Sequence, residues 1–386
     1  MALNPETTAI TSGRGDDTSL SAPIWATSVW ESDSLADARA RASGMKSARF
    51  YGRYANPTVS QLESAVAEME HAEAALAFAS GMGAMSSTIL ALCSQGSHIV
   101  AQDNMYGATM AFLQGPCARL GIETTFVDAR VPGAFADAVI AGRTTLVIAE
   151  TPSNPLLTVT DLRELGSIKG PFTLVDSTLA TPLGQQPLEF GIDLVLHSAT
   201  KGIGGHNDAL LGVIAGETDL VEAVWTHSVM HGAVPSPHEA AAVLRGLRTL
   251  PVRLERQHAS ALRIAAELSR HQRVTAVHHP FLDSHPQHQL ATAQMRMGGT
   301  VLSFEVEGGF EACAKFVDAT RLSRVATSFG GPETLLCHPA TSTHVGLNRD
   351  DQLRAGITDS LLRVSVGLES ADDLVADLIG ALDASV

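Results

Sequence analysis

The sequence predicts an α/β fold, with a mostly parallel central sheet followed by a smaller C-terminal α/β domain. The first observation is length, because 386 residues exceed what one hydrophobic core usually serves. The second is a series of short, nearly continuous apolar segments separated by helical stretches, a pattern typical of parallel strands that are covered on both faces. These segments span residues 98–102, 124–129, 145–150, 172–177, 193–200 and 209–216.

The segment before these strands predicts an arm and a helix. Residues 1–50 lack sustained periodicity, which is typical of an N-terminal arm that lies over other surfaces and often belongs to an oligomer interface. A helix is expected from Pro57, because Leu62, Val66 and Met69 recur at close to helical spacing. The chain is thus expected to pass from the arm into a helix that opens on a proline.

A second series of helices and strands is predicted in the last third of the chain. A helical region runs from Ser236 to a proline, Pro251, at its end. Two strands and a terminal helix are then predicted, over residues 301–306, 361–366 and 371–384. We therefore place the domain boundary near Pro251, with the main domain over 51–250 and the C-terminal domain over 251–386.

Charge and composition favour a cytoplasmic protein that acts on a small molecule. The 41 acidic and 26 basic residues give a net charge of -15, which would repel nucleic acid and anionic lipid. No apolar run is long enough to cross a membrane, and the N-terminus lacks the basic start and apolar stretch of a secretion signal. The cysteines are far apart and are expected to be reduced thiols: Cys93, Cys117, Cys313 and Cys337.

Polar residues stand where three of the predicted strands end. Glu150, Asp176 and Ser198 each close an apolar segment and are followed by polar or turn-forming residues. Ligands of parallel sheets gather at the carboxyl ends of the strands. We therefore expect these three side chains to converge on one edge of the sheet.

Lys201 directly follows one of these strands, between Ser198 and Thr200 on one side and several glycines on the other. A lysine in such a place can form an imine with an aldehyde cofactor if its surroundings lower its pKa. The two hydroxyls could reach a phosphate. An ordinary lysine at a strand exit explains this segment equally well.

The stretch FASGMGAMSS, residues 78–87, predicts a helix start that could hold a phosphate on free backbone N–H groups. Gly81 and Gly83 suggest a dinucleotide fingerprint, but its third glycine is replaced by Ser86. Close packing of this helix against its neighbours would explain the two glycines as well as a dinucleotide-binding site would. A cofactor with one phosphate fits better.

Three further side chains could take part in such a site. Asp176 could pair with a protonated pyridine nitrogen, or simply cap the next turn. Tyr106 could stack on a cofactor ring, although half-buried packing is the commoner role of such a tyrosine. Arg363 lies inside an apolar strand and needs a carboxylate partner, for which a structural ion pair is the simpler explanation and a substrate the alternative.

Four histidines cluster between residues 278 and 288. Their spacing is irregular and no helical pair with an acidic companion is present, so they are interpreted as surface histidines. We assign no metal. The four are His278, His279, His285 and His288.

Taken together, these segments resemble the Cys/Met-metabolism family of pyridoxal-phosphate enzymes, which includes cystathionine γ-synthase, cystathionine γ-lyase, homoserine-ester sulfhydrylases and methionine γ-lyase. The resemblance runs from about residue 20 to the C-terminus. It rests on many motifs in the same order, among them FYGRYANPT (50–58), FASGMGA (78–84), MYGAT (105–109), ETPSNPL (150–156), VDSTLATP (175–182), HSATKGIGGHND (197–208), SFGGPETLLCHPATSTH (328–344) and LLRVSVGLE (361–369).

The resemblance implies the aspartate-aminotransferase-like fold (fold type I) and a role for each motif. Lys201 would hold the cofactor as a Schiff base, Asp176 would pair with the pyridine nitrogen and Tyr106 would stack on the ring. Arg363 would bind the substrate carboxylate. The phosphate would be held by Gly81, Met82, Ser198 and Thr200.

The same resemblance implies further site residues and an assembly. Ser328 and Asn154 would assist in holding the carboxylate and the cofactor. Tyr51 and Arg53 would reach the phosphate of a neighbouring subunit. A homotetramer built from active dimers is expected.

Departures from the family pattern bear on the substrate, an amino acid. The acidic residues of the cystathionine lyases appear here as Phe50 and Thr327, so the distal ammonium of cystathionine would lose two partners. The cysteine typical of methionine γ-lyase is Ala108, and its Lys-Asp pair is absent before Gly232. We therefore expect γ-replacement on an O-acylated homoserine by cysteine or sulfide. Elimination from cystathionine or methionine is the alternative, and a non-catalytic binding protein on the same scaffold is a remote one.

Overall fold

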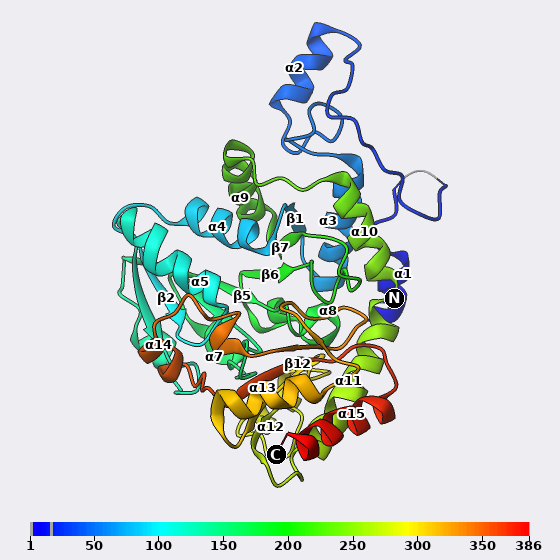
Figure 1. The fold of residues 1–386 in the computed structure, drawn as a ribbon. Coiled ribbons are helices and arrows are strands. Elements are labelled where there is room, and N and C mark those ends of the chain that lie inside the picture. The colour runs from blue at the N-terminus through cyan, green and yellow to red at the C-terminus, as the bar shows by residue number, and fades with distance from the viewer. Residues whose placement is uncertain (1–2, 16–17, 386) are drawn as a thin grey trace.

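The computed structural model describes residues 3–15 and 18–385, which form two sheets with helices around them (Figure 1). The larger sheet has the strand order β1-β7-β6-β5-β4-β2-β3. β7 is antiparallel to both of its neighbours, and the remaining pairs are parallel. Its strands are β1 (Ala74–Phe78), β2 (His98–Gln102), β3 (Glu123–Val127), β4 (Thr144–Glu150), β5 (Phe172–Asp176), β6 (Leu194–Ser198) and β7 (Gly212–Gly216). The predicted mostly parallel sheet is confirmed.

Helices cover both faces of the larger sheet. On one face α4 (Gly81–Leu92) and α9 (Thr218–His231) pack against Leu76, Phe78 and Ile214. On the other face α3 (Pro57–Glu70) and α10 (Pro237–Arg248) cover apolar side chains of β6 and β7. Shorter helices complete this part of the chain: α5 (Gly107–Phe112), α6 (Ala134–Asp137), α7 (Leu162–Ser167) and α8 (Thr181–Gly184).

Local sequence explains where the helices begin. α3 starts with Pro57 after Asn56, whose side chain accepts a hydrogen bond from the backbone N–H of Thr58. Ser80 caps α4 in the same way, because its hydroxyl accepts from the backbone N–H of Gly83. A serine also precedes the first proline of α10. The Ser80 cap fixes the start of α4, the helix on which the phosphate prediction depends.

The smaller sheet has the order β10-β11-β12-β9-β8. Its strands are β8 (Val274–His278), β9 (Val301–Val306), β10 (Arg324–Val325), β11 (Leu335–Cys337) and β12 (Leu361–Ser365). α11 (Leu250–Leu268), α13 (Gly309–Ala319) and α15 (Ala371–Ala384) pack against it in one apolar cluster. Two short helices, α12 (His288–Gln294) and α14 (Arg349–Arg354), complete it. Pro251 lies in the first turn of α11, and the predicted domain boundary there stays a prediction.

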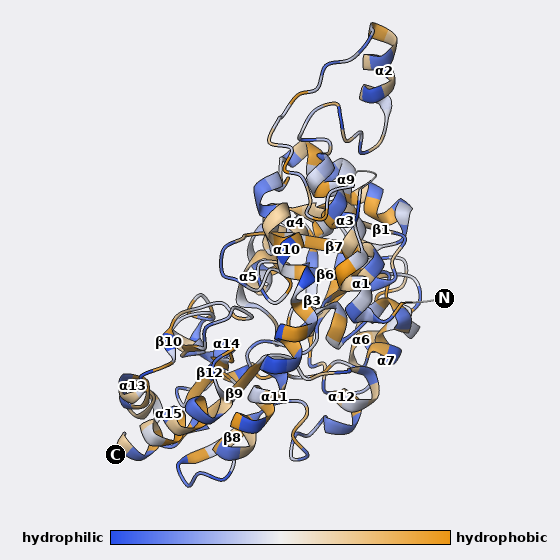
Figure 2. Cartoon of the chain, turned by 90° about the vertical axis from the view of Figure 1, so that its right-hand side faces the viewer, coloured by the Kyte–Doolittle hydropathy of each residue, from blue (hydrophilic) through white to orange (hydrophobic). Residues whose placement is uncertain are grey.

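The N-terminal segment has two parts. α1 (Pro5–Thr11) packs on the body of the protein, where Arg248 donates to the carbonyl of Ala9 at 2.8 Å. The chain that follows, including α2 (Leu35–Ser43), projects away from the two sheets (Figures 1 and 2). Large apolar side chains on it stand in solvent, with Leu20 86% and Leu35 91% exposed.

The histidine prediction was wrong at two positions. His279 and His285 are buried, whereas His278 and His288 are half-buried. His279 turns inward at the end of β8 and stacks on His258, with 5.8 Å between ring centroids, so it packs as an aromatic ring. Burial is the main reason why its pKa falls to about 3. Among the described residues, no group of three or more potential metal ligands is found.

No helix in the described part of the chain combines the length and the apolar character that a membrane span requires.

Candidate active site

A cavity of about 320 Å³ lies at the carboxyl ends of β4, β5 and β6, between the two sheets. Glu150, Asp176 and Ser198 all line it, as their positions at strand ends predict. Glu150 and Asp176 are neighbours in strand register. The cavity wall also contains the following predicted site residues: Gly81, Met82, Tyr106, Asn154, Thr200, Lys201, Ser328 and Arg363.

Lys201 leaves β6 on a tight turn and points into this cavity. Its Nζ donates to Ser328 Oγ at 2.6 Å and lies 5.3 Å from the centre of the Phe329 ring. Burial, assisted by the positive charge of Arg363, lowers the pKa of the Lys201 amine to about 8. At pH 7 roughly a tenth of this amine is therefore neutral and nucleophilic, far more than for an ordinary lysine.

Ser328 holds an unusual backbone conformation. Its φ is +82°, in the left-handed region that side-chain-bearing residues rarely adopt. Such a conformation costs about 1–3 kcal/mol and persists only where the surroundings enforce it. Here it directs the hydroxyl toward Lys201 while the backbone carbonyl accepts from Arg363 Nη2 at 2.8 Å.

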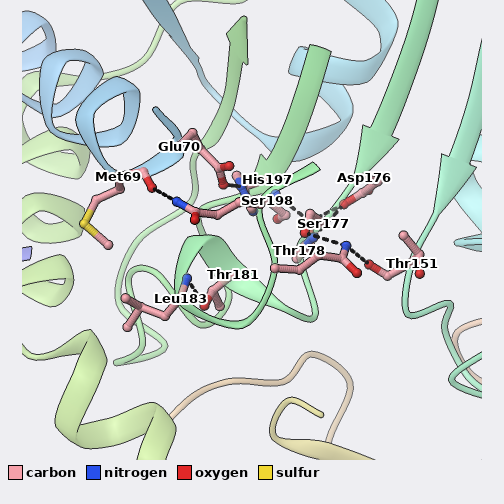
Figure 3. Close-up of polar contacts among 12 residues, drawn as sticks. Met69, Glu70, Thr151, Asp176, Ser177, Thr178, Thr181, Leu183, His197 and Ser198 are labelled. Atoms are coloured by element: carbon pink, nitrogen blue, oxygen red, sulfur yellow. Dashed lines mark hydrogen bonds and ion pairs between the residues drawn. The ribbon is translucent and has the colours of Figure 1, made fainter. Parts of the chain in front are cut away.

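Asp176 is held by its neighbour Thr178. Both the backbone N–H and the hydroxyl of Thr178 donate to Asp176 Oδ1, at 3.0 and 2.5 Å. The same hydroxyl accepts from the backbone N–H of Ser198 at 2.8 Å, so it links β5 to β6 (Figure 3). Burial raises the pKa of Asp176, and the bonds from Thr178 oppose that rise. A cationic partner in the cavity would stabilise the ionised carboxylate.

A buried contact between a histidine and a carboxyl group lies on the other face of the sheet from Asp176. His197 Nε2 is 2.5 Å from Glu70 Oε1, and both side chains are fully buried (Figure 3). Successive residues of a strand point to opposite faces, so His197 points away from the cavity that Ser198 lines. The electrostatic effect of His197 opposes the rise in the pKa of Asp176.

Glu150 binds two backbone N–H groups, a role that its position at a strand end did not predict. One carboxylate oxygen accepts from the backbone N–H of Tyr106 at 2.6 Å, and the other accepts from that of Asn154 at 2.7 Å. Burial, and then the nearby charge of Asp176, raise the pKa of Glu150 to about 8. Glu150 therefore fixes the backbone of two cavity residues.

Arg363 sits at the centre of β12 with an incompletely satisfied guanidinium. Nη1 donates to Asn154 Oδ1 at 2.9 Å and Nη2 donates to the Ser328 carbonyl, while the buried Nε has no partner. Within residues 3–15 and 18–385, Arg363 forms no ion pair. The structural ion pair favoured from the sequence is therefore not found, and a buried cation in a cavity wall remains available to an anion.

The start of α4 forms a close-fitting wall of the cavity. A Cβ on Gly81 would lie 2.8 Å from the Cβ of Ser198, so a side chain there would collide with the end of β6. Backbone N–H groups at this helix start are of the kind that binds phosphate. The hydroxyl of Thr200 donates to the carbonyl of Leu211 at 3.2 Å and accepts from its N–H at 2.9 Å.

Two predicted site residues lie outside the cavity. Tyr51 is 40% exposed, and the Arg53 guanidinium stacks on the rings of Tyr51 and Tyr54 while it donates to the carbonyl of Val229. Within one chain neither reaches Lys201. Their predicted contact with a neighbouring subunit stays a prediction.

Comparisons with known proteins agree with this architecture. The family model described as "Cys/Met metabolism PLP-dependent enzyme" matches residues 6–383. The L-methionine gamma-lyase of Fusobacterium nucleatum is 39% identical over 94% of this chain and 93% of its own. The O-succinylhomoserine sulfhydrylase of Pseudomonas aeruginosa is 40% identical over 94% of this chain and 90% of its own.

Among solved structures, cystathionine gamma synthase from Xanthomonas oryzae pv. oryzae, in complex with aminoacrylate and cysteine, superposes with a TM-score of 0.93 at 36% identity. That match covers 100% of this chain and 99% of the other, so it extends over both sheets and the arm. With this fold and a family match along nearly its whole length, the chain belongs to the Cys/Met-metabolism family of pyridoxal-phosphate-dependent enzymes of sulfur amino-acid metabolism.

Proposed function

We propose that this enzyme replaces the γ-acyloxy group of an O-acylated homoserine with the sulfur of cysteine or sulfide. The observation that carries the proposal is the neutral lining beside Ser328, where Thr327 faces the cavity. The cavity's carboxylates, Glu150 and Asp176, already accept hydrogen bonds from the protein. A second ammonium group, as in cystathionine, would find no free carboxylate on these described walls.

The cavity residues fit the cofactor of the family. Lys201 would supply the amine for the aldehyde, and Asp176 would supply a carboxylate for the ring nitrogen. The start of α4, with Met82 and Ser198, would hold the phosphate, while Tyr106 would cover the ring. When bound, pyridoxal phosphate supplies an electron sink for negative charge at the substrate's α-carbon.

The remaining chemistry falls to the chain's own side chains. Arg363, held by Asn154, would bind the substrate carboxylate with its unsatisfied guanidinium. Lys201 would move protons at the α- and β-carbons as general base and acid, which suits an amine whose pKa is about 8. The C–O bond at the γ-carbon would then break, and the acyloxy group would leave with the electron pair. The thiol would lose its proton as its sulfur forms the new C–S bond, and the protons removed from the α- and β-carbons would return to them.

Elimination is the second candidate function, because a relative 39% identical is named L-methionine gamma-lyase. Replacement and elimination use the same residues up to the loss of the γ-substituent. A direct assay separates them: purified enzyme is incubated with O-succinylhomoserine or O-acetylhomoserine plus cysteine or sulfide, and separately with cystathionine or methionine. Thioether or homocysteine formation should exceed 2-oxobutanoate release. Faster release of 2-oxobutanoate from cystathionine or methionine would overturn the proposal.

Tyr51 and Arg53 are proposed to complete the site of a neighbouring subunit in a homotetramer. Both lie outside the cavity of their own chain, on the segment that carries the exposed Leu20 and Leu35. A complementation experiment tests this. Lys201→Ala chains are mixed with Arg53→Ala chains after mild dissociation. Partial recovery of activity supports shared sites, because some hybrid sites then contain neither change, whereas no recovery from freely exchanging subunits contradicts them.

A further inference from the structure

The buried face of α11 carries two polar side chains one helical turn apart. Arg253 is 5% exposed and Gln257 is 1% exposed, in a stripe that is otherwise mainly apolar. Residues four apart lie on the same face of a helix. Neither residue lines the cavity.

Arg253 binds the turn that carries Lys201. Its Nη1 donates to the carbonyl of Gly202 at 2.9 Å, and its Nη2 donates to those of Ile203 at 3.2 Å and Gly246 at 2.7 Å. Nε donates to the hydroxyl of Thr249. In the described part of the chain this buried cation forms no ion pair. The planar fork of a guanidinium is therefore used to fix several carbonyls at once.

The packing around this turn leaves no room for a side chain at two of its glycine contacts. A Cβ on Gly205 would lie 1.8 Å from Arg253 Nη1, and a Cβ on Gly246 would lie 2.0 Å from the Gly204 carbonyl oxygen. The guanidinium thus occupies the space beside the turn as well as binding it. A smaller or differently shaped side chain would leave the turn without this support.

Gln257 binds the two segments that carry Ser328 and Arg363. Its Nε2 donates to the carbonyl of Gly331 at 2.8 Å and to that of Val366 at 2.9 Å. Gly331 lies three residues after Ser328, and Val366 lies three residues after Arg363. One amide group therefore joins the loop of Ser328 to the end of the strand that carries Arg363.

The two bound segments also touch each other. A Cβ on Gly330 would lie 2.6 Å from the backbone nitrogen of Gly202, so these backbones are in direct contact. Across this contact Lys201 Nζ reaches Ser328 Oγ. A shift of either segment would change the placement of the amine relative to the guanidinium.

We infer that Arg253 and Gln257 are positioning residues of the active site: Arg253 sets Lys201, and Gln257 sets Ser328 and Arg363. The inference deepens the proposed function and rests on it. The two residues act on different halves of the site, so their loss should produce different kinetic defects. Displacement of a reacting group by about 1 Å can cost roughly a hundredfold in rate.

The test compares Arg253→Met and Gln257→Met in the loaded enzyme, with the substrate that the wild type uses fastest. Arg253→Met should lower kcat by about tenfold or more, weaken pyridoxal-phosphate binding and alter the visible absorbance of the bound cofactor. Gln257→Met should mainly raise KM for the amino-acid substrate, by roughly tenfold, and leave the spectrum near that of the wild type. A purely structural role would lower stability without this kcat-against-KM division.

Two matched controls lie outside the site. Arg248 also donates to carbonyls, those of Ala9 and Ser12 in the N-terminal segment, and Gln294 donates to the carbonyl of Thr160. Arg248→Met and Gln294→Met should keep the wild-type kcat, KM and spectrum. The inference is overturned if Arg253→Met and Gln257→Met behave like these controls, or if both show one identical defect.

A second pair of variants tests the inference if Arg253→Met and Gln257→Met fail to fold. Arg253→Lys keeps a cation but lacks the planar fork, so kcat should fall less than in Arg253→Met. Gln257→Asn keeps the amide on a shorter stem and should raise KM. Wild-type kinetics in both would overturn the inference. A wild-type enzyme that takes up the cofactor but does not act on homoserine esters would instead contradict the proposed replacement reaction.

Discussion

Lys201 and Ser328 meet at 2.6 Å although 127 residues separate them in the sequence. The lysine follows a strand of the larger sheet, and the serine belongs to a loop between strands of the smaller one. Ser328 reaches this position only with a φ of +82°. The contact therefore joins a strained backbone to the amine that we propose as the cofactor-binding group, and the backbone strain and the hydroxyl contact can be tested separately.

Two replacements of Ser328 should distinguish the cost of its backbone strain from the contribution of its hydroxyl to activity. Ser328→Gly and Ser328→Ala both remove the hydroxyl that accepts from Lys201, so both should lower kcat/KM by roughly tenfold or more. Glycine adopts a positive φ without strain, so Ser328→Gly should be more stable than Ser328→Ala by about 1 kcal/mol. Urea unfolding at matched pH measures the difference. Equal stability of the two variants would argue against strain at this position.

Lys201 should destabilise the cofactor-free protein at neutral pH. Folding lowers the pKa of its amine from 10.5 to about 8, so between these values the unfolded chain binds more protons and stability rises with pH. Below pH 8 the full penalty applies. Lys201→Met should therefore raise the free energy of unfolding by about 1–3 kcal/mol at pH 7, with a gain that shrinks toward pH 10. Chemical unfolding across this range checks the sign, and a loss of stability at pH 7 would contradict it.

Glu150 should make stability depend on pH in the opposite direction. Its pKa rises from 4.5 to about 8 on folding, so the folded chain binds more protons between these values and loses stability as pH increases. Glu150→Gln removes this titration but also replaces one of the two carboxylate oxygens, each of which accepts from one backbone N–H group. We expect the melting temperature of the cofactor-free variant to fall less between pH 5 and pH 8 than that of the wild type. Parallel curves for the two proteins would rule out a raised pKa at Glu150.

Arg363 should be required for recognition of the substrate carboxylate. Arg363→Met removes a buried cation whose Nε has no protein partner, so KM should rise by roughly ten- to a hundredfold. A substrate amide, which lacks the carboxylate, provides the control. The wild type should strongly prefer the acid over the amide, and the variant should lose that preference. An unchanged preference would place the carboxylate elsewhere.

The sequence predicted the framework of this site better than its supporting contacts. The strands His98–Gln102 and Val301–Val306 and the helix Ala371–Ala384 lie where apolar patterns and their boundaries placed them. Three polar residues at strand ends converge as expected, because parallel strands share a carboxyl edge.

What the sequence did not reveal depends on tertiary contacts. Glu150 contacts the backbone of Tyr106, 44 residues away, and backbone groups carry no sequence signal. His279 was misplaced because its partner His258 lies on a different element and only folding brings the two rings together. The role of Arg253 was not predicted, because the carbonyls that it binds become available only after the turn of Lys201 has formed.

The visible absorbance spectrum of the purified enzyme, with and without Lys201, tests the central claim most directly. Wild-type enzyme incubated with pyridoxal phosphate should show the visible band of a lysine-bound cofactor and should turn over substrate. Lys201→Ala should lack that band and lose activity by about a thousandfold or more, because it loses both the covalent attachment and the proton-transferring amine. A Lys201→Ala protein with the wild-type spectrum and full activity would contradict the account.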